Sequence, residues 1–121
     1  MDVYRERLIR LYKNPLNFGE LKDADLKSQV SNVSCGDEVD LYIKKASNGR
    51  ITDIKFKGQS CAICTASSSL VTEYLKGKSI DEAKKVNKEK VIELLGVDLT
   101  KNPTRLKCAL LILDALKKLK L

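Results

Sequence analysis

Two stretches in the first half of the chain alternate apolar and polar side chains, and they constrain the fold more than any other feature. Their apolar or β-branched members recur at every second position: Val39, Leu41, Ile43, Thr52, Ile54 and Phe56. A period of two is typical of strands that bury one face. Between the stretches, Asn48-Gly49 favours the positive φ angles of a type I′ turn. The sequence therefore predicts an antiparallel hairpin over residues 39–57.

The segments before this hairpin are less regular. Apolar residues recur at helical spacing from Tyr4 to Tyr12, and Asn14-Pro15 ends the pattern because the residue before proline avoids the α region. A loop is expected to about Asp25. Residues 26–34 carry only a weak periodic signal, so periodicity assigns them to no element.

Helical signals dominate after Gly58. Ala66, Leu70 and Tyr74 share one face of a predicted helix, and Gly77 is its expected stop. Later helix boundaries are indicated by a capping box at Ser79-Ile80-Asp81-Glu82, a cap at Asn87, a stop at Gly96 and a cap with a following proline at Asn102-Pro103. A last helix is expected to run nearly to Leu121. Its predicted buried stripe contains Leu106, Leu110, Leu113 and Leu116.

Composition limits the class of protein. A chain of 121 residues with 43% apolar content is expected to form one domain, residues 1–121, whose core needs no disulfide. Its charged start has no export signal, and its longest apolar run, 108–113, is too short for a bilayer, so we expect a cytoplasmic protein that does not enter the membrane. The net charge is +7, but the basic residues are mixed with acidic ones along the chain, and only 5% of residues are aromatic. This composition argues against binding to nucleic acid and favours acidic protein partners.

The chain has four cysteines and no histidine, which points to soft-metal chemistry. Thiolates suit iron–sulfur clusters, zinc or cuprous copper. Cys35 lies in Cys35-Gly36-Asp37, Cys61 and Cys64 lie at a predicted strand-to-helix junction, and Cys108 is expected near the start of the last helix. Any one of them alone is explained as a small buried hydrophobe, except Cys35, which lies beside Gly36 and Asp37 in a polar loop. Together, three thiolates near element ends can converge on one metal, with Asp37 as a nearby carboxylate.

Further motifs occur in a specific order along the chain. They are Asn14-Pro15, Cys35-Gly36-Asp37, the run from Ala66 to Glu73 leading into Lys76-Gly77-Lys78-Ser79, and Leu106-Lys107-Cys108. This set resembles the IscU/NifU N-terminal/SufU family of iron–sulfur cluster assembly scaffolds over nearly the whole chain. The resemblance implies a single compact α+β domain with helices packed against a three-stranded antiparallel sheet. It also implies a scaffold rather than an enzyme, which assembles a [2Fe–2S] cluster from iron and desulfurase-derived sulfur and transfers it to apo-proteins.

The resemblance also implies a ligand set of Cys35, Asp37, Cys61 and Cys108. Asp37 is expected to be the more exchangeable ligand of this set, because a carboxylate is harder than a thiolate. Zinc is an expected substitute for iron, since it accepts similar tetrahedral coordination. Sulfur is expected to arrive as a persulfide on Cys108, with Cys35 as the rival acceptor.

Two residues beside the ligand set depart from the IscU pattern. Cys64 stands where the family usually has alanine or serine, and it is interpreted as a packed helix residue, with a spare ligand or a sulfur relay as alternatives. Lys107 replaces the histidine of IscU types and resembles the SufU pattern. It is either an ordinary solvated lysine or a cation that stabilises neighbouring thiolates.

The implied partners are a cysteine desulfurase and acceptor apo-proteins, with a ferredoxin or another electron donor and a homodimer as further candidates. Residues 101–105 replace the Leu-Pro-Pro-Val-Lys segment of bacterial IscU proteins, which argues against recognition by their dedicated heat-shock chaperone. The interval between Cys61 and Cys108 is too short for the insertion of SufU zinc proteins, so a zinc-binding sulfur acceptor is the less favoured alternative.

A second alternative comes from Cys61-Ala62-Ile63-Cys64. A pair of cysteines after a strand and before a helix is the local context of a thiol-disulfide oxidoreductase. Against this function, the predicted elements lack the alternating βαβ order expected around such a motif. A purely structural zinc domain is also less favoured, because a core of this size folds without metal.

Overall fold

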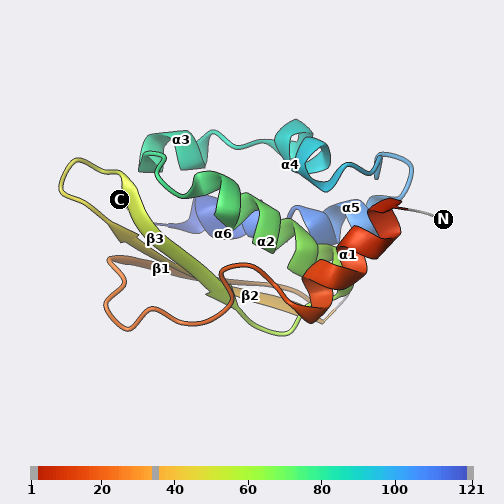
Figure 1. Ribbon diagram of the computed structural model, residues 1–121, viewed down its shortest axis with the longest axis horizontal. Helices are drawn as coiled ribbons and strands as arrows, with labels where there is room; N and C mark the ends of the chain where they lie inside the picture. The colour runs from red at the N-terminus through yellow and green to blue at the C-terminus, as the bar shows by residue number, and fades with distance from the viewer. Residues whose placement is uncertain (1–2, 34–35, 120–121) are drawn as a thin grey trace.

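The structure, a computed structural model, describes residues 3–33 and 36–119 (Figure 1). The elements in chain order are α1 (Val3–Lys13), β1 (Leu26–Asn32), β2 (Asp37–Lys45), β3 (Ile51–Lys57), α2 (Ala62–Leu75), α3 (Ile80–Lys84), α4 (Lys88–Leu95), α5 (Pro103–Ala109) and α6 (Leu111–Lys118). Among these helices, none has the length and apolar character needed to cross a bilayer.

The three strands form one antiparallel sheet in the order β1-β2-β3. Figure 1 shows the helices gathered on one side of this sheet, with α2 and α6 lying across it. The predicted hairpin and the α+β class with a three-stranded sheet are confirmed. β1 occupies the segment to which periodicity assigned no element, because its inward residues are only half-buried at the edge of the sheet.

The hairpin differs from the prediction in two details. Thr52 is exposed and Ile51 is buried, because the register shifts between Lys44 and Lys45 and moves Ile51 to the core side of the sheet. The type I′ turn is also wrong, since Gly49 has a positive φ of 84° and Asn48 does not. The backbone N–H of Gly49 donates to the carbonyl of Ala46 at 2.9 Å, as in a three-residue loop that ends in a left-handed glycine.

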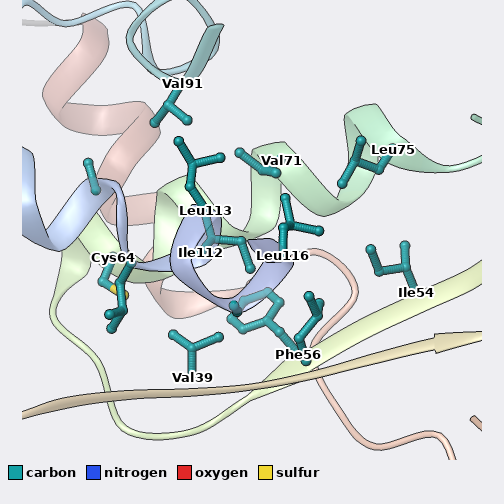
Figure 2. Packing of buried hydrophobic residues seen from close by; sticks show 14 of the residues in the cluster. Val39, Ile54, Phe56, Cys64, Val71, Leu75, Val91, Ile112, Leu113 and Leu116 are labelled. Atoms are coloured by element: carbon teal, nitrogen blue, oxygen red, sulfur yellow. The ribbon is translucent and has the colours of Figure 1, made fainter. Parts of the chain in front are cut away.

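The core lies between the sheet and the helices (Figure 2). Val39, Ile54 and Phe56 rise from the strands toward residues of α2 and α6, and Phe56 is only 1% exposed. From the helix side, Val71 and Ile112 close this cluster. The alternation that predicted the strands therefore provides the apolar face on which α2 is positioned.

Most of the predicted helix ends are confirmed. Side-chain caps hold three N-termini, with Ser79 accepting from Glu82 N–H at 3.1 Å, Asn87 from Lys90 N–H at 2.9 Å and Asn102 from Arg105 N–H at 3.2 Å. Gly96 ends α4 in the left-handed conformation. These caps satisfy N–H groups that have no partner within the helix, which fixes where each helix begins.

The predicted single C-terminal helix is wrong, because the chain breaks it into α5 and α6 at Leu110. The Ser67 hydroxyl of α2 donates to the carbonyl of Ala109, which a continuous helix would pair with Leu113 N–H. Leu113 N–H donates instead to the carbonyl of Leu110 at 3.0 Å. In the predicted stripe, Leu113 and Leu116 are buried, whereas Leu106 and Leu110 are only half-buried.

Candidate metal centre

Three predicted ligands come together at one end of the domain. Asp37 is the first residue of β2, Cys61 is the N-cap of α2, and Cys108 lies in the last turn of α5. One carboxylate oxygen and the two Sγ atoms all lie within 4.8 Å of one another. The remaining predicted ligand, Cys35, lies outside the described residues. The structure therefore places a carboxylate and two thiols where one metal site can form.

Gly58 brings two of these ligands together, although the sequence pattern indicated only an element boundary there. Its φ is +129°, and a Cβ at this position would lie 2.3 Å from the carbonyl oxygen of Glu38. Next to it, Glu38 N–H donates to the carbonyl of Gln59 at 2.7 Å. This close approach joins the start of β2 to the segment that leads into Cys61. The available sequence signal was a glycine directly after a strand and three residues before a cysteine.

Asp37 is 3% exposed, and its two carboxylate oxygens have different surroundings. Oδ1 accepts a hydrogen bond from Cys61 N–H at 2.9 Å, which ties β2 to the N-terminus of α2. Oδ2 is buried and has no hydrogen-bond partner among the described residues. A buried carboxylate oxygen without a donor is costly unless a cation compensates it. The carboxylate therefore fits a metal ligand, and its hydrogen bond to Cys61, 24 residues away, joins two elements instead of closing a local turn.

Cys61 presents an exposed thiol at the N-terminus of α2. Its Sγ accepts from Cys64 N–H at 3.5 Å in the position of a helix cap. This bond satisfies an N–H group at the helix N-terminus that has no partner within the helix. An exposed sulfur of this kind is accessible both to a metal and to a sulfur donor.

Cys108 is 5% exposed. The sequence predicted it near the start of the last helix, and this position is wrong. It stands in the last turn of α5, just before the break at Leu110, where the Ser67 hydroxyl donates to the carbonyl of Ala109. Its choice as the persulfide acceptor stays a prediction that now has to rest on proximity to the other ligands.

Cys64 is fully buried and packs in the cluster that contains Val39 and Ile112 (Figure 2). Burial raises the pKa of its thiol to about 12, while a hydrogen bond from Ser60 acts in the opposite direction. It is not a member of the convergent group formed by the described carboxylates and thiols. The packed interpretation of Cys64 is thus the one that its surroundings support.

Lys107 is exposed and lines a surface hollow of about 280 Å³ beside the centre. Asn32 and Asp114 lie on the same hollow, and Asn32 is the strand partner of Asp37. A cation at this rim contributes little binding energy because water screens it. The position supports a solvated lysine near the approach to the metal centre.

Comparison with known proteins gives the class of this fold and site. The family model described as the NifU-like N terminal domain matches residues 3–119. A scaffold protein for iron–sulfur cluster assembly from Archaeoglobus fulgidus, IscU 1, is 41% identical over 116 residues, which cover 96% of this chain and 73% of that protein. The iron–sulfur cluster assembly enzyme IscU of Drosophila melanogaster is also 41% identical, covering 95% of this chain and 74% of the relative.

A solved structure has the same arrangement of elements. It is a crystal structure from Fervidobacterium islandicum AW-1, described as an iron–sulfur cluster assembly scaffold protein for the SUF system. It superposes with a TM-score of 0.78 at 29% identity and covers 93% of this chain and 92% of that one. The chain therefore belongs to the family of NifU-like N-terminal domains.

Proposed function

We propose that this protein is a scaffold on which an iron–sulfur cluster is assembled and from which it is transferred to acceptor proteins. The observation that carries the proposal is the convergence of Asp37, Cys61 and Cys108, with a buried carboxylate oxygen that has no donor among the described residues. IscU 1 of Archaeoglobus fulgidus, which is named as an assembly scaffold and matches almost the whole chain, supports the same function.

The cluster is the cargo of this site. Cys61 and Cys108 supply thiolates and Asp37 supplies a carboxylate, and Cys35, two residues before Asp37, completes a set of three thiolates and one oxygen ligand. Such a set suits a [2Fe–2S] cluster, whose irons prefer thiolate. The oxygen ligand is harder and is displaced first by an incoming thiol, so the proposed site releases its cluster more readily than four cysteines would.

The proposed partners follow from this chemistry. A cysteine desulfurase supplies sulfur at the oxidation level of a persulfide, an electron donor such as a ferredoxin reduces it, and an acceptor apo-protein removes the finished cluster. The protein itself acts as a carrier, in the cytoplasm, with residues 1–121 as one scaffold domain. The antiparallel order of the sheet does not support the oxidoreductase alternative, which expects a βαβ arrangement around its cysteine pair.

Anaerobic reconstitution with ferrous iron and sulfide tests the proposal. The parent protein is expected to develop the charge-transfer absorption of a [2Fe–2S] centre, while Cys35→Ala, Cys61→Ala and Cys108→Ala each lose most of it. Thr104→Ala, an exposed substitution in the same helix as Cys108, is the matched control and should keep full absorption. Tight zinc binding without any iron–sulfur spectrum would favour the zinc-binding sulfur acceptor. Full cluster occupancy in Cys61→Ala or Cys108→Ala would contradict the ligand assignment.

A further inference from the structure

Cys61 and Cys64 form a pair of thiols with opposite accessibility. Cys61 is exposed at the N-cap of α2, whereas Cys64 is fully buried three residues later. The backbone N–H of Cys64 points at the Sγ of Cys61, with the nitrogen 3.5 Å from the sulfur. Residues three apart in the first turn of a helix lie on the same side of it, so the two side chains are neighbours.

We propose that Cys64 is a catalytic residue that releases sulfide from a persulfide carried by Cys61. The inference rests on the proposed function, because the persulfide is the form in which a desulfurase supplies sulfur. It gives a role to the one described cysteine that is not among the convergent metal-binding groups.

The difference in exposure gives the two sulfurs different roles, with Cys61 accepting sulfur and Cys64 attacking afterwards. A protein or small-molecule sulfur donor reaches the exposed Cys61 thiol directly, and it does not reach the Cys64 thiol through the packed core. In this proposal sulfur enters at Cys61, which takes the place of Cys108, the acceptor expected from the sequence. Once Cys61 carries it, Cys64 is a second thiol held next to the new sulfur–sulfur bond by the first turn of α2. The exposed Cys61 thiol, which accepts sulfur, and the buried Cys64 thiol beside it are the two members of the proposed resolving pair.

The chemical step is a thiol–disulfide exchange. The Cys64 sulfur attacks the Cys61 Sγ, a Cys61–Cys64 disulfide forms, and the bond between Cys61 Sγ and its outer sulfur breaks. The outer sulfur leaves with its own proton and the proton of the Cys64 thiol, as hydrogen sulfide. In this step the Cys64 sulfur is oxidised from the thiol to the disulfide level, the Cys61 sulfur keeps its oxidation level, and the outer sulfur is reduced to sulfide. A dithiol reductant then reopens the disulfide, which restores Cys61 as a ligand.

Sulfide is the oxidation level that an iron–sulfur cluster contains, so this step produces it beside the metal ligands. The Cys61 sulfur lies within 4.8 Å of Cys108 Sγ and of an Asp37 oxygen. Cys108 is the competing thiol, and attack by its sulfur would form a Cys61–Cys108 disulfide instead. The two routes differ in which cysteines end in the disulfide, which makes them separable by peptide mapping.

The test uses the full-length, metal-free, reduced protein. A cysteine desulfurase with cysteine loads the persulfide under anaerobic conditions, the excess cysteine is removed, and free sulfide and intact mass are followed with time. The parent is expected to release about one sulfide per chain and to lose two hydrogens in mass relative to the reduced protein, as the exchange stoichiometry requires. Peptide mapping should show a Cys61–Cys64 disulfide.

Two variants remove the proposed attacking sulfur. Cys64→Ala and the nearly isosteric Cys64→Ser should keep the extra sulfur on Cys61 and release sulfide at least about tenfold more slowly. Their circular dichroism should match the parent's, and either folded variant suffices for the test. Thr104→Ala, an exposed substitution outside the cysteine set, should release sulfide at the parent rate.

Three results would overturn the inference: equal release in the parent and the Cys64 variants, a Cys61–Cys108 disulfide as the product, or a persulfide that remains on the parent. Reconstitution of the parent with iron and inorganic sulfide bypasses the step. If that protein assembles a cluster but shows no Cys64-dependent release, the inference fails and the proposed scaffold function stands. If it binds no cluster, the proposed function itself fails.

Discussion

Replacing Asp37 should make the metal-free protein more stable. The substitution to alanine removes one hydrogen bond to a charged acceptor, the 2.9 Å bond from Cys61 N–H, which contributes about 1.5–3 kcal/mol. It also removes a carboxylate that is 3% exposed and has one oxygen without a partner among the described residues. Burial of an uncompensated charge costs several kcal/mol, so the second effect outweighs the first.

The expected net effect is a rise of about 1–2 kcal/mol in the free energy of unfolding, which for a domain of this size raises Tm by about 4–8 °C. Asp37→Asn keeps an oxygen acceptor for Cys61 N–H and should gain at least as much. The measurement is urea or thermal unfolding of chelator-treated protein. Asp98→Ala is the matched control, because Asp98 is exposed and accepts from Thr100 N–H at 2.9 Å, so its loss should lower stability slightly.

Zinc provides an internal check on the sign of this effect. A metal that binds only the folded state adds stability according to its affinity, and the parent has one more ligand than the variant. Saturating zinc should therefore stabilise the parent more than Asp37→Ala and reduce or reverse the difference between them. If metal-free Asp37→Ala instead loses about 1 kcal/mol or more, Asp37 is a structural hydrogen-bond acceptor and the argument from the buried oxygen is refuted.

Four further outcomes are expected. Gly58→Ala should lower the free energy of unfolding in urea by about 3 kcal/mol or more, because its Cβ would lie 2.3 Å from Glu38 O. Gly49→Ala, with φ +84° and no atom near its Cβ, should lower it by about 1 kcal/mol. Similar losses in the two variants would contradict the close-approach argument. Phe56→Ala should lose about 3–5 kcal/mol in the same assay, since the ring is 1% exposed, and a loss near zero would contradict its place in the core. Asp37→Ala should keep its cluster but transfer it more slowly to an apo-ferredoxin, and an unchanged rate would remove Asp37 from the exchange step. The complex with a cysteine desulfurase should weaken as salt rises, as measured by titration calorimetry, unless the net charge of +7 plays no part in docking.

The sequence predicted the parts of the fold that depend on interactions between residues close together in the chain. The caps at Ser79, Asn87 and Asn102 each join residues three apart, so the residue types and their spacing contain the whole interaction. The hairpin was predicted for the same reason, from alternation within each strand. Its turn type was not, because the register shift between Lys44 and Lys45 depends on how the two strands meet.

Long-range hydrogen bonds account for what periodicity missed. Leucines at regular spacing predicted one C-terminal helix, but the carbonyl of Ala109 accepts from the Ser67 hydroxyl, 42 residues away, and Leu113 N–H donates to Leu110 instead. This break determines that Cys108 ends a helix rather than beginning one. No pattern within residues 103–119 contains that information, since the donor belongs to another helix.

The dependence on long-range contacts also explains why the ligand residues could be predicted from the sequence, whereas their proximity in space could not. Residue chemistry and family resemblance indicated Asp37, Cys61 and Cys108, but contact between them depends on the Glu38–Gln59 and Asp37–Cys61 hydrogen bonds. Both bonds join segments more than twenty residues apart, and both form only when β2 pairs with β3 and α2 packs on the sheet. Because the site requires this closure, metal affinity is coupled to folding, and a variant that loosens the Gly58 contact should lose metal binding together with stability.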